Sequence, residues 1–331
     1  MTNSISIIIC TRNRPEQIRE CLEHLARSSL AAVCEILVLD QSAQPLELEG
    51  LPAAVRPLLR YHSRPGRGLA KARNQAIRLA RGEILAFTDD DCVVSSSWAD
   101  QIWRAFDANP HVDGVYGRVL AYDDGSAPVT YHRWATAFGE ISYATRPGGV
   151  SCTALFDKPN AAAFRRPVMP IENLGAGNNM AFRRRVFERH GLFVEDLGAG
   201  GPLRSGEDCE FHYRLLRAGC TLLYDPSVLI YHNGWLGAER SAALHDDYTC
   251  GIIAVFVSYA LRGDRLAREY LRFRFGTVRQ EVIDSTTTPA ARKPLSYYTN
   301  RARAFWQGFI GGVRLAVLDR RAIPRLVQHT R

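Results

Sequence analysis

Three short apolar runs, each ending next to a polar side chain, limit what this chain can fold into more than any other feature. The runs are SISIIIC (residues 4–10), EILVLD (35–40) and EILAFT (83–88). Between them, apolar residues recur at helical spacing in 15–25 and in 69–80, so strands and helices alternate. This alternation predicts a mostly parallel sheet with both faces covered, and ligands of such sheets bind at the carboxyl ends of the strands.

Acidic and hydroxyl side chains stand where these strands end. Thr11 follows the first run, Asp40 ends the second, and Asp89, Asp90 and Asp91 follow the third. Three adjacent carboxylates repel one another, but a hard divalent cation such as Mg²⁺ or Mn²⁺ offsets the repulsion and can bridge to the phosphates of a nucleotide. A metal site is one interpretation of the aspartate run, and an acidic surface turn is the other.

A second acidic cluster, SGEDCEF (205–211), enters a predicted helix. Glu207, Asp208 and Glu210 could each act as a base that deprotonates a hydroxyl group. Ser205 and Asp208 also resemble a helix capping box, and the helix dipole would keep Asp208 ionised, so the two interpretations can hold together. His232 ends another predicted strand, where it is either a hydrogen-bonded structural residue or a neutral metal ligand.

The net charge of +8 is concentrated in the last fifth of the chain. Residues 1–261 hold 27 Lys and Arg against 29 Asp and Glu, whereas 262–331 hold 15 against 5. Aromatic residues are interspersed there, as in SYYTNRARAFWQGF (296–309). The region is either a solvated basic helical face or a surface for anionic lipid or for an acidic or lipid-linked partner. Nucleic acid is not an expected partner, because no recognisable RNA- or DNA-binding motif accompanies the charge.

The cysteines and the hydrophobic runs indicate the compartment. Eight cysteines show no CxxC or zinc-finger spacing, and no run reads as a secretion signal or a membrane span. We therefore expect reduced thiols in a cytoplasmic protein, with the basic C-terminal region as the part that would contact the cytoplasmic face of a membrane.

Six motifs, taken together and in this order, resemble those of family 2 glycosyltransferases of the GT-A type. They are SIIICTRNRPEQI, EILVLDQS, GLAKARNQAI, GEILAFTDDDC, GNNMAFRR and SGEDCEFHYRL. The resemblance covers about residues 3–235 and implies a Rossmann-like α/β fold with a mixed, mostly parallel sheet flanked by helices. It implies a catalytic domain over 1–240, in which 1–118 binds a nucleotide-sugar and 119–240 forms the acceptor half. Residues 241–331 are then a basic, aromatic-rich helical extension.

The activity implied by the resemblance is metal-dependent, inverting transfer of a sugar from a UDP- or dTDP-linked donor to a hydroxyl of a glycan or lipid-linked acceptor. Matched by position, the donor-binding residues are Thr11, Arg12, Asp40, Arg73, Asn74, Asp89 and Asp90. The loop facing the sugar and acceptor comprises Gly177, Asn178, Asn179 and Glu207, and Asp208 is the general base. Asp91 and His232 match ligands of Mn²⁺ or Mg²⁺. Gln41-Ser42 departs from the family's usual residues after the base-binding aspartate, which leaves uracil and thymine both open.

Two other interpretations of the same residues remain. The pattern Asp89-x-Asp91-x-Val93 resembles the nucleophile motif of haloacid-dehalogenase-type phosphatases, although that motif normally belongs to the first strand. A non-catalytic module that binds nucleotide-sugars or glycans is the other alternative, but such a module has no use for a base at Asp208. A phosphoaspartate at Asp89 would favour the phosphatase, and slow donor hydrolysis would exclude the non-catalytic module.

Overall fold

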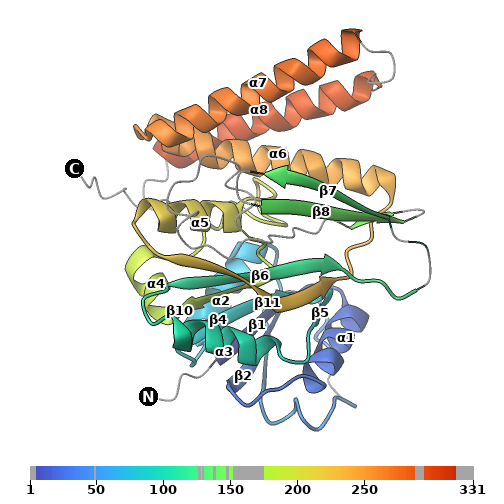
Figure 1. Ribbon diagram of the computed structural model, residues 1–331, viewed down its shortest axis with the longest axis vertical. Helices are drawn as coiled ribbons and strands as arrows, with labels where there is room; N and C mark the ends of the chain where they lie inside the picture. Colours follow the sequence, from blue (N-terminus) through green and yellow to red (C-terminus); the bar gives the residue numbers. More distant parts are fainter. Residues whose placement is uncertain are drawn as a thin grey trace.

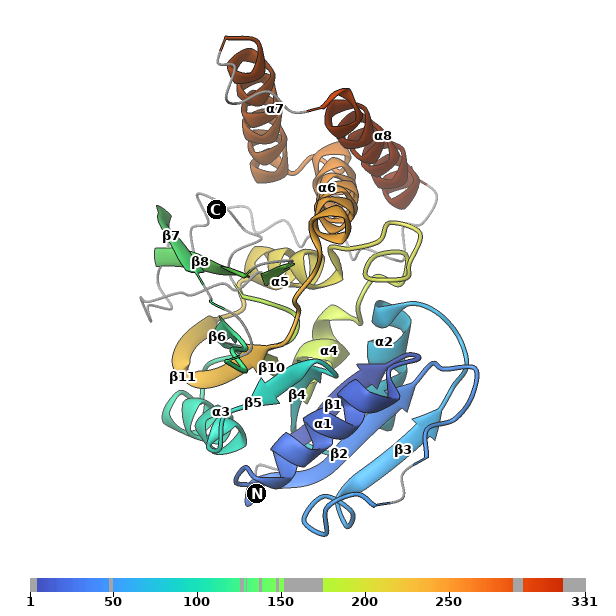
Figure 2. The same ribbon diagram turned by 90° about the vertical axis from the view of Figure 1, so that its right-hand side faces the viewer.

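The computed structural model describes residues 5–47, 50–125, 128, 130–136, 139–146, 149–151, 175–287 and 294–317. A large sheet with helices on both faces forms one end of the molecule, and long helices from the C-terminal part form the other (Figures 1 and 2). The predicted α/β fold class is confirmed.

The large sheet has eight strands in the order β3-β2-β1-β4-β10-β6-β11-β5. The strands are β1 (Ile5–Thr11), β2 (Val33–Asp40), β3 (Leu59–Ser63), β4 (Ile84–Asp89), β5 (Cys92–Val94), β6 (Gly114–Ala121), β10 (Met180–Arg183) and β11 (Leu222–His232). β1 pairs in parallel with β2 and β4, and β10 enters antiparallel between β4 and β6. The sheet is therefore mixed but mostly parallel, as predicted.

Alternate side chains of the central strands fill two separate cores. On one face, Ile8 and Phe87 pack with α2 (Leu69–Leu79), α4 (Arg184–His190) and α5 (Glu207–Arg217). On the other, Ile7 and Ile9 pack with α1 (Pro15–Ala26) and α3 (Trp98–Ala108). Because both faces are dry, polar groups of the central strands are confined to the strand ends, where Thr11 lies beside Asp40 and Cys10 beside Asp89.

The middle of the chain is more regular than its sequence indicates. The Gly, Pro, Tyr and Arg content and weak periodicity of 119–170 predict irregular strands and loops, whereas β7 (Thr130–Thr136), β8 (Gly139–Arg146) and β9 (Gly149–Ser151) form a three-stranded antiparallel sheet in the order β7-β8-β9. Weak periodicity hid these strands because their alternation is interrupted by Gly and Arg. The rest of that region, 152–170, lies outside the described residues.

Three long helices follow the sheet: α6 (Ala238–Leu261), α7 (Arg265–Thr287) and α8 (Leu295–Val317). α6 lies against α5, and α7 and α8 lie on the other side of α6. α6 shares the core on the α5 side of the large sheet, and its Tyr259 hydroxyl donates to Glu210 at 2.7 Å. α8 crosses α6 closely at two glycines: a Cβ on Gly308 would lie 2.4 Å from the Cys250 carbonyl oxygen, and one on Gly312 2.6 Å from that of Ala254. The domain boundary at 240 stays a prediction. Among the described helices, none has the length and apolarity needed to cross a membrane.

Candidate active site

The aspartate run forms the turn between β4 and β5, and its three carboxylates diverge. Asp90 points toward α1, where it accepts hydrogen bonds from the Thr11 hydroxyl and the Arg14 guanidinium, both at 2.7 Å. Arg14 also donates to Asp91 at 2.9 Å. Burial and the charge of Asp91 raise the pKa of Asp90 to about 6, and Arg14 opposes that rise. Asp90 therefore ties the turn to the end of β1 and the start of α1.

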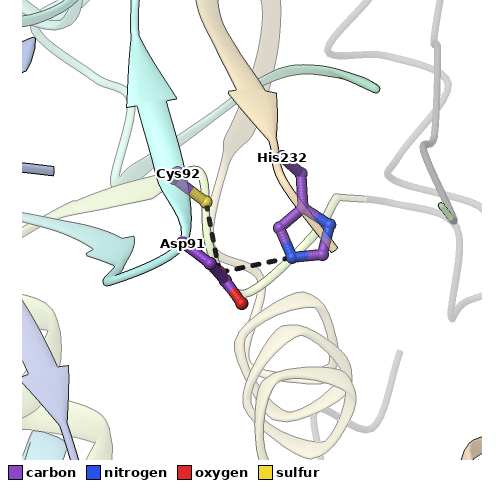
Figure 3. Close-up of side chains that lie close together, drawn as sticks. All are labelled: Asp91, Cys92 and His232. Atoms are coloured by element: carbon purple, nitrogen blue, oxygen red, sulfur yellow. Dashed lines mark hydrogen bonds and ion pairs between the residues drawn. The ribbon is translucent and has the colours of Figure 1, made fainter. Parts of the chain in front are cut away.

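Asp91 faces His232, which lies at the end of β11 (Figure 3). The Asp91 Oδ1 and His232 Nε2 atoms are 3.4 Å apart, and the two side chains are 16% and 22% exposed. Burial alone would raise the pKa of Asp91, but the hydrogen bond and charge of His232, together with Arg14, lower it to about 2. Asp91 is thus held as a carboxylate that is still open to solvent.

Asp91 and His232 fit a divalent metal ion by their chemistry. Their ligating atoms and the Cys92 sulfur all lie within 4.8 Å of one another. A carboxylate oxygen suits Mn²⁺ or Mg²⁺, whereas an imidazole nitrogen suits a transition-metal ion such as Mn²⁺ better than Mg²⁺, and two protein ligands leave room for further oxygen ligands. Burial raises the pKa of the Cys92 thiol well above its ordinary value, so Cys92 stays protonated and is the weakest donor of the three.

Arg73, which is buried in α2, joins the aspartate run to the second acidic cluster. Its guanidinium donates to Asp89 at 3.1 Å, to Glu207 at 2.9 Å and to the Gly177 carbonyl oxygen at 3.0 Å. Burial raises the pKa of Asp89, as does the charge of Asp91, against the effect of Arg73. Burial and the charge of Asp208 likewise raise the pKa of Glu207 to about 7. One arginine therefore connects the end of β4 with the start of α5.

Asp208 lies in the first turn of α5, half-buried, with both carboxylate oxygens oriented by backbone donors. The Gly177 N–H donates to Oδ2 at 3.0 Å, and the Cys209 N–H donates to Oδ1 at 2.7 Å. The helix begins after Gly206, whose φ of 88° suits glycine, so the predicted capping by Ser205 is wrong. The Ser205 hydroxyl instead donates to the Asp247 carbonyl oxygen of α6 at 2.8 Å.

Gly177 lets Asp208 and Arg73 meet across one backbone unit. A Cβ at this position would lie 2.9 Å from Asp208 Oδ2 and 3.1 Å from Arg73 Nη1. Its N–H and its carbonyl oxygen bond to these two residues in turn. Asn178, next to it, is 8% exposed, and its Oδ1 atom has no hydrogen-bond partner in the part of the chain that the structure describes. The Gly177 backbone therefore joins Asp208 to Arg73, and the Asn178 amide oxygen beside it is buried.

Other predicted site residues are turned into the protein. Asp40 is 0% exposed and accepts hydrogen bonds from the Ser42 N–H at 2.8 Å and the Tyr61 hydroxyl at 2.7 Å. The Asn74 amide donates to Glu195 at 3.1 Å and to the Phe193 carbonyl oxygen at 2.9 Å. Their assignment to donor binding stays a prediction, because what the structure shows for them is the positioning of neighbouring loops.

Asn179 and Arg12 are likewise separate from the acidic centre. The Asn179 amide is 0% exposed and links three strands or helices: it accepts from the Trp98 indole and donates to the carbonyl oxygens of Arg118 and Val228. Arg12 is exposed, and the arginine that reaches the aspartates is Arg14. Sequence reasoning missed Arg14, although it lies in the same TRNR motif. The helix that begins at Pro15 determines which of the two arginines faces the aspartates.

Comparison with known families decides between the alternative interpretations. The model of the family described as glycosyl transferase family 2 matches residues 6–191, more than half of the chain and including the aspartate run. The chain belongs to this family. The resemblance seen in the motifs is confirmed, and the phosphatase interpretation of Asp89 has no support from this match.

Curated relatives of this family 2 chain are distant. It is 24% identical over 230 residues to the pre-mycofactocin glycosyltransferase of Mycobacterium tuberculosis, a match that covers 69% of this chain and 42% of the relative. It is 26% identical over 243 residues to the succinoglycan biosynthesis protein ExoM of Rhizobium meliloti, covering 70% of this chain and 67% of ExoM. The chain thus spans about two-fifths of the length of the mycobacterial relatives.

Two solved structures share the fold over nearly the whole chain. The mannosyltransferase PcManGT of Pyrobaculum calidifontis, solved with GDP-Man and Mn²⁺, has a TM-score of 0.54 at 18% identity and covers 95% of this chain and 87% of its own. TarS 1–349 of S. aureus, solved with UDP-GlcNAc, has a TM-score of 0.58 at 16% identity, covering 96% and 85%. The family 2 chain therefore has the GT-A fold.

Proposed function

We propose that this protein transfers a sugar from a UDP- or dTDP-linked donor to a hydroxyl of a glycan or lipid-linked acceptor, with inversion at the anomeric carbon. The observation that carries the proposal is the hydrogen-bonded chain from Asp89 through Arg73 and Gly177 to Asp208. This chain of hydrogen bonds links the half-buried carboxylate of Asp208 to the aspartate run at the carboxyl end of β4. The GDP-Man complex of PcManGT and the UDP-GlcNAc complex of TarS support a nucleoside-diphosphate-sugar donor, and the TarS complex supports a uridine-linked one.

Asp208 is the general base in this proposal. Its carboxylate takes the proton from the acceptor hydroxyl while the hydroxyl oxygen bonds to the anomeric carbon, and the bond from that carbon to the diphosphate oxygen breaks on the opposite side. Because Asp208 accepts from two backbone N–H groups at the start of α5, its carboxylate is held in one orientation. The electron pair of the broken bond leaves with the nucleoside diphosphate, and configuration inverts.

Asp91 and His232 would hold a Mn²⁺ or Mg²⁺ ion against the diphosphate, as the Mn²⁺ in PcManGT suggests. A bound divalent ion neutralises the charge that develops on the departing phosphate oxygen. Arg73 keeps Asp89 and Glu207 paired so that the remaining acids of the site do not repel the donor. Arg14 pairs with Asp90 in the same way, and the Thr11 hydroxyl donates a hydrogen bond to that carboxylate.

Asp208→Asn tests the proposed base. A general base contributes about 10²- to 10⁴-fold, so the variant should lose roughly that much nucleoside diphosphate release from a panel of UDP-, dTDP- and GDP-sugars with Mn²⁺ or Mg²⁺. Thermal stabilisation by the donor plus metal should persist, because the base does not bind the diphosphate. Asp107→Asn, an exposed acid on α3, is the matched control and should behave as the native protein.

Asp91→Ala separates metal binding from base catalysis. The variant should require more metal for donor-dependent stabilisation, whereas Asp208→Asn should not. An Asp208→Asn variant with native turnover would remove Asp208 from its role, and an unchanged metal requirement in Asp91→Ala would remove Asp91. A native protein that binds donors but never releases nucleoside diphosphate, with or without acceptors, would favour the non-catalytic module.

A further inference from the structure

The side of α8 that faces solvent carries large apolar residues. Leu295, Trp306, Phe309, Ile310 and Val317 are 78%, 63%, 37%, 53% and 56% exposed. Since an α-helix turns once in about 3.6 residues, these five lie along one side of α8, and we name them the outer stripe. The Trp306 and Phe309 rings stack with centroids 5.7 Å apart and planes 8° from parallel. Large apolar side chains gathered on a solvent-facing side of a helix indicate an interaction surface.

Small residues occupy the opposite side of α8 and fix its orientation. Ala304, Gly308 and Gly312 are buried, and the two glycines approach the α6 backbone too closely for any side chain. α7 is anchored likewise, because Tyr270 is buried and stacks on Phe256 of α6 with centroids 3.8 Å apart. The solvent-facing sides of both helices therefore point away from α6 and from the catalytic sheet (Figures 1 and 2).

Arginines are frequent on α8, which carries the outer stripe, and on its neighbour α7. α7 and α8 together hold eight arginines against three acidic residues, and α8 has no acid at all. Arg265, Arg268 and Arg272, spaced for one side of α7, line an open recess of about 200 Å³. Arg303 and Arg314 are exposed beside the stripe on α8. Guanidinium groups in this spacing suit several phosphate groups rather than one buried ligand.

We propose that α7 and α8 bind the surface of a bilayer that contains anionic phospholipid. The outer stripe lies at the boundary between headgroups and acyl chains, and Trp306 and Phe309 supply the apolar area that such a position needs. The exposed arginines of α7 and α8 bind lipid phosphates, whereas Arg301 is paired with Asp246 of α6, and the recess lined by Arg265, Arg268 and Arg272 receives a headgroup. α6 and α5 then lie between the lipid and the catalytic sheet.

Charge favours a bilayer over a second copy of this chain. A symmetric dimer through the outer stripe would place the same arginine-rich helices of two molecules against each other, and like charges in an interface cost binding energy. An anionic surface neutralises these arginines while it covers the same apolar side chains. The bilayer is therefore the occupant that satisfies both features of the surface.

Sedimentation of the full chain with phosphatidylcholine vesicles, with and without phosphatidylglycerol, tests this proposal. The native protein should bind the anionic vesicles at least roughly tenfold more tightly than the neutral ones. Trp306→Ala combined with Phe309→Ala should weaken binding by roughly tenfold or more at any salt concentration. Arg268→Gln combined with Arg272→Gln should weaken it by roughly thirtyfold at low salt and less at high salt.

Two matched variants control for charge and for exposed aromatic area. Arg78→Gln with Arg81→Gln removes the same charge from the exposed side and end of α2, and Tyr248→Ala removes a 48% exposed aromatic ring from α6. Both should bind vesicles as the native protein does. Circular dichroism and the melting temperature check that each variant is folded.

Three outcomes would overturn the proposal: no binding by the native protein, equal binding to neutral and anionic vesicles, or native binding by either test pair. A concentration-dependent dimer in light scattering that Trp306→Ala abolishes would assign the stripe to a second copy instead. No donor or acceptor enters this experiment, so its result is independent of the proposed glycosyl transfer. Nucleoside diphosphate release in solution should be unchanged in all these variants.

Discussion

The central sheet and α8 are both rich in apolar residues, but they place them in opposite ways. In β1, Ile5, Ile7, Ile8 and Ile9 are at most 1% exposed. In α8 the large side chains face solvent, and the buried side consists mainly of Ala and Gly. In the sheet, an apolar residue is a buried residue. In α8, the close approach of α6 instead decides which side is buried, and small residues occupy that side. The apolar residues of the sheet stabilise the fold, and those of the outer stripe are free to bind something else.

Phe182→Ala should have the largest effect on stability. Phe182 is 0% exposed in β10 and packs edge-to-face on Phe211 and Phe187 with ring centroids 5.0 and 5.7 Å away. Truncation of a buried Phe costs about 3–5 kcal/mol because it removes contacts and leaves a cavity. Urea unfolding measures this loss. A change below about 1 kcal/mol would mean that this core is loosely packed, and the contrast between the sheet and α8 would fail.

Gly312→Val tests whether the small residues of α8 set its orientation. The added side chain would collide with the Ala254 carbonyl oxygen and with Val257 of α6, so we expect a loss of about 1–3 kcal/mol. Gly276→Val is the control, because a Cβ there on α7 meets nothing within 4 Å. Val has a higher helix propensity than Gly, so Gly276→Val should cause no loss, and equal losses in the two variants would mean that the contact with α6 is not the cause.

Glu207→Gln tests the charge pairing at the carboxyl ends of the strands. The quantity that tests it is the pH dependence of the free energy of unfolding. Because burial and Asp208 raise the pKa of Glu207 to about 7, the folded protein keeps a proton between about pH 4.5 and pH 7 that the unfolded chain has lost. This contribution to the free energy of unfolding is present at low pH and declines as pH rises, by at most ~1.4 kcal/mol per pH unit.

The Gln variant lacks this decline. Its melting temperature relative to the native protein should therefore increase as pH rises through that window, as measured by calorimetry at several pH values. Asp107→Asn, with its exposed acid, should show a constant difference. A difference for Glu207→Gln that stays constant or shrinks with rising pH would mean that Glu207 is ionised throughout, paired with Arg73.

The fold was predictable from the strands, and the site was predictable only in part. The three apolar runs determine β1, β2 and β4. Parallel pairing brings Thr11, Asp40 and the aspartates together at the carboxyl ends of these strands. Sequence order cannot show that Arg73 spans 134 positions to reach Glu207, because that contact depends on how α2 and α5 pack. Nor can residue type show that the amides of Asn74 and Asn179 turn inward to hold backbone groups.

Trp306→Ala should have the smallest effect on stability, although Trp306 is among the largest side chains in the molecule. It is 63% exposed, and its stacking partner Phe309 is itself 37% exposed, so truncation removes little buried area. Surface substitutions of this kind usually change the free energy of unfolding by less than about 0.5 kcal/mol. Urea unfolding beside Phe182→Ala makes the comparison direct, since both changes delete an aromatic ring. A loss above about 2 kcal/mol would show that Trp306 helps to hold α8 in place, whereas a negligible loss leaves lipid binding as the property that this ring serves.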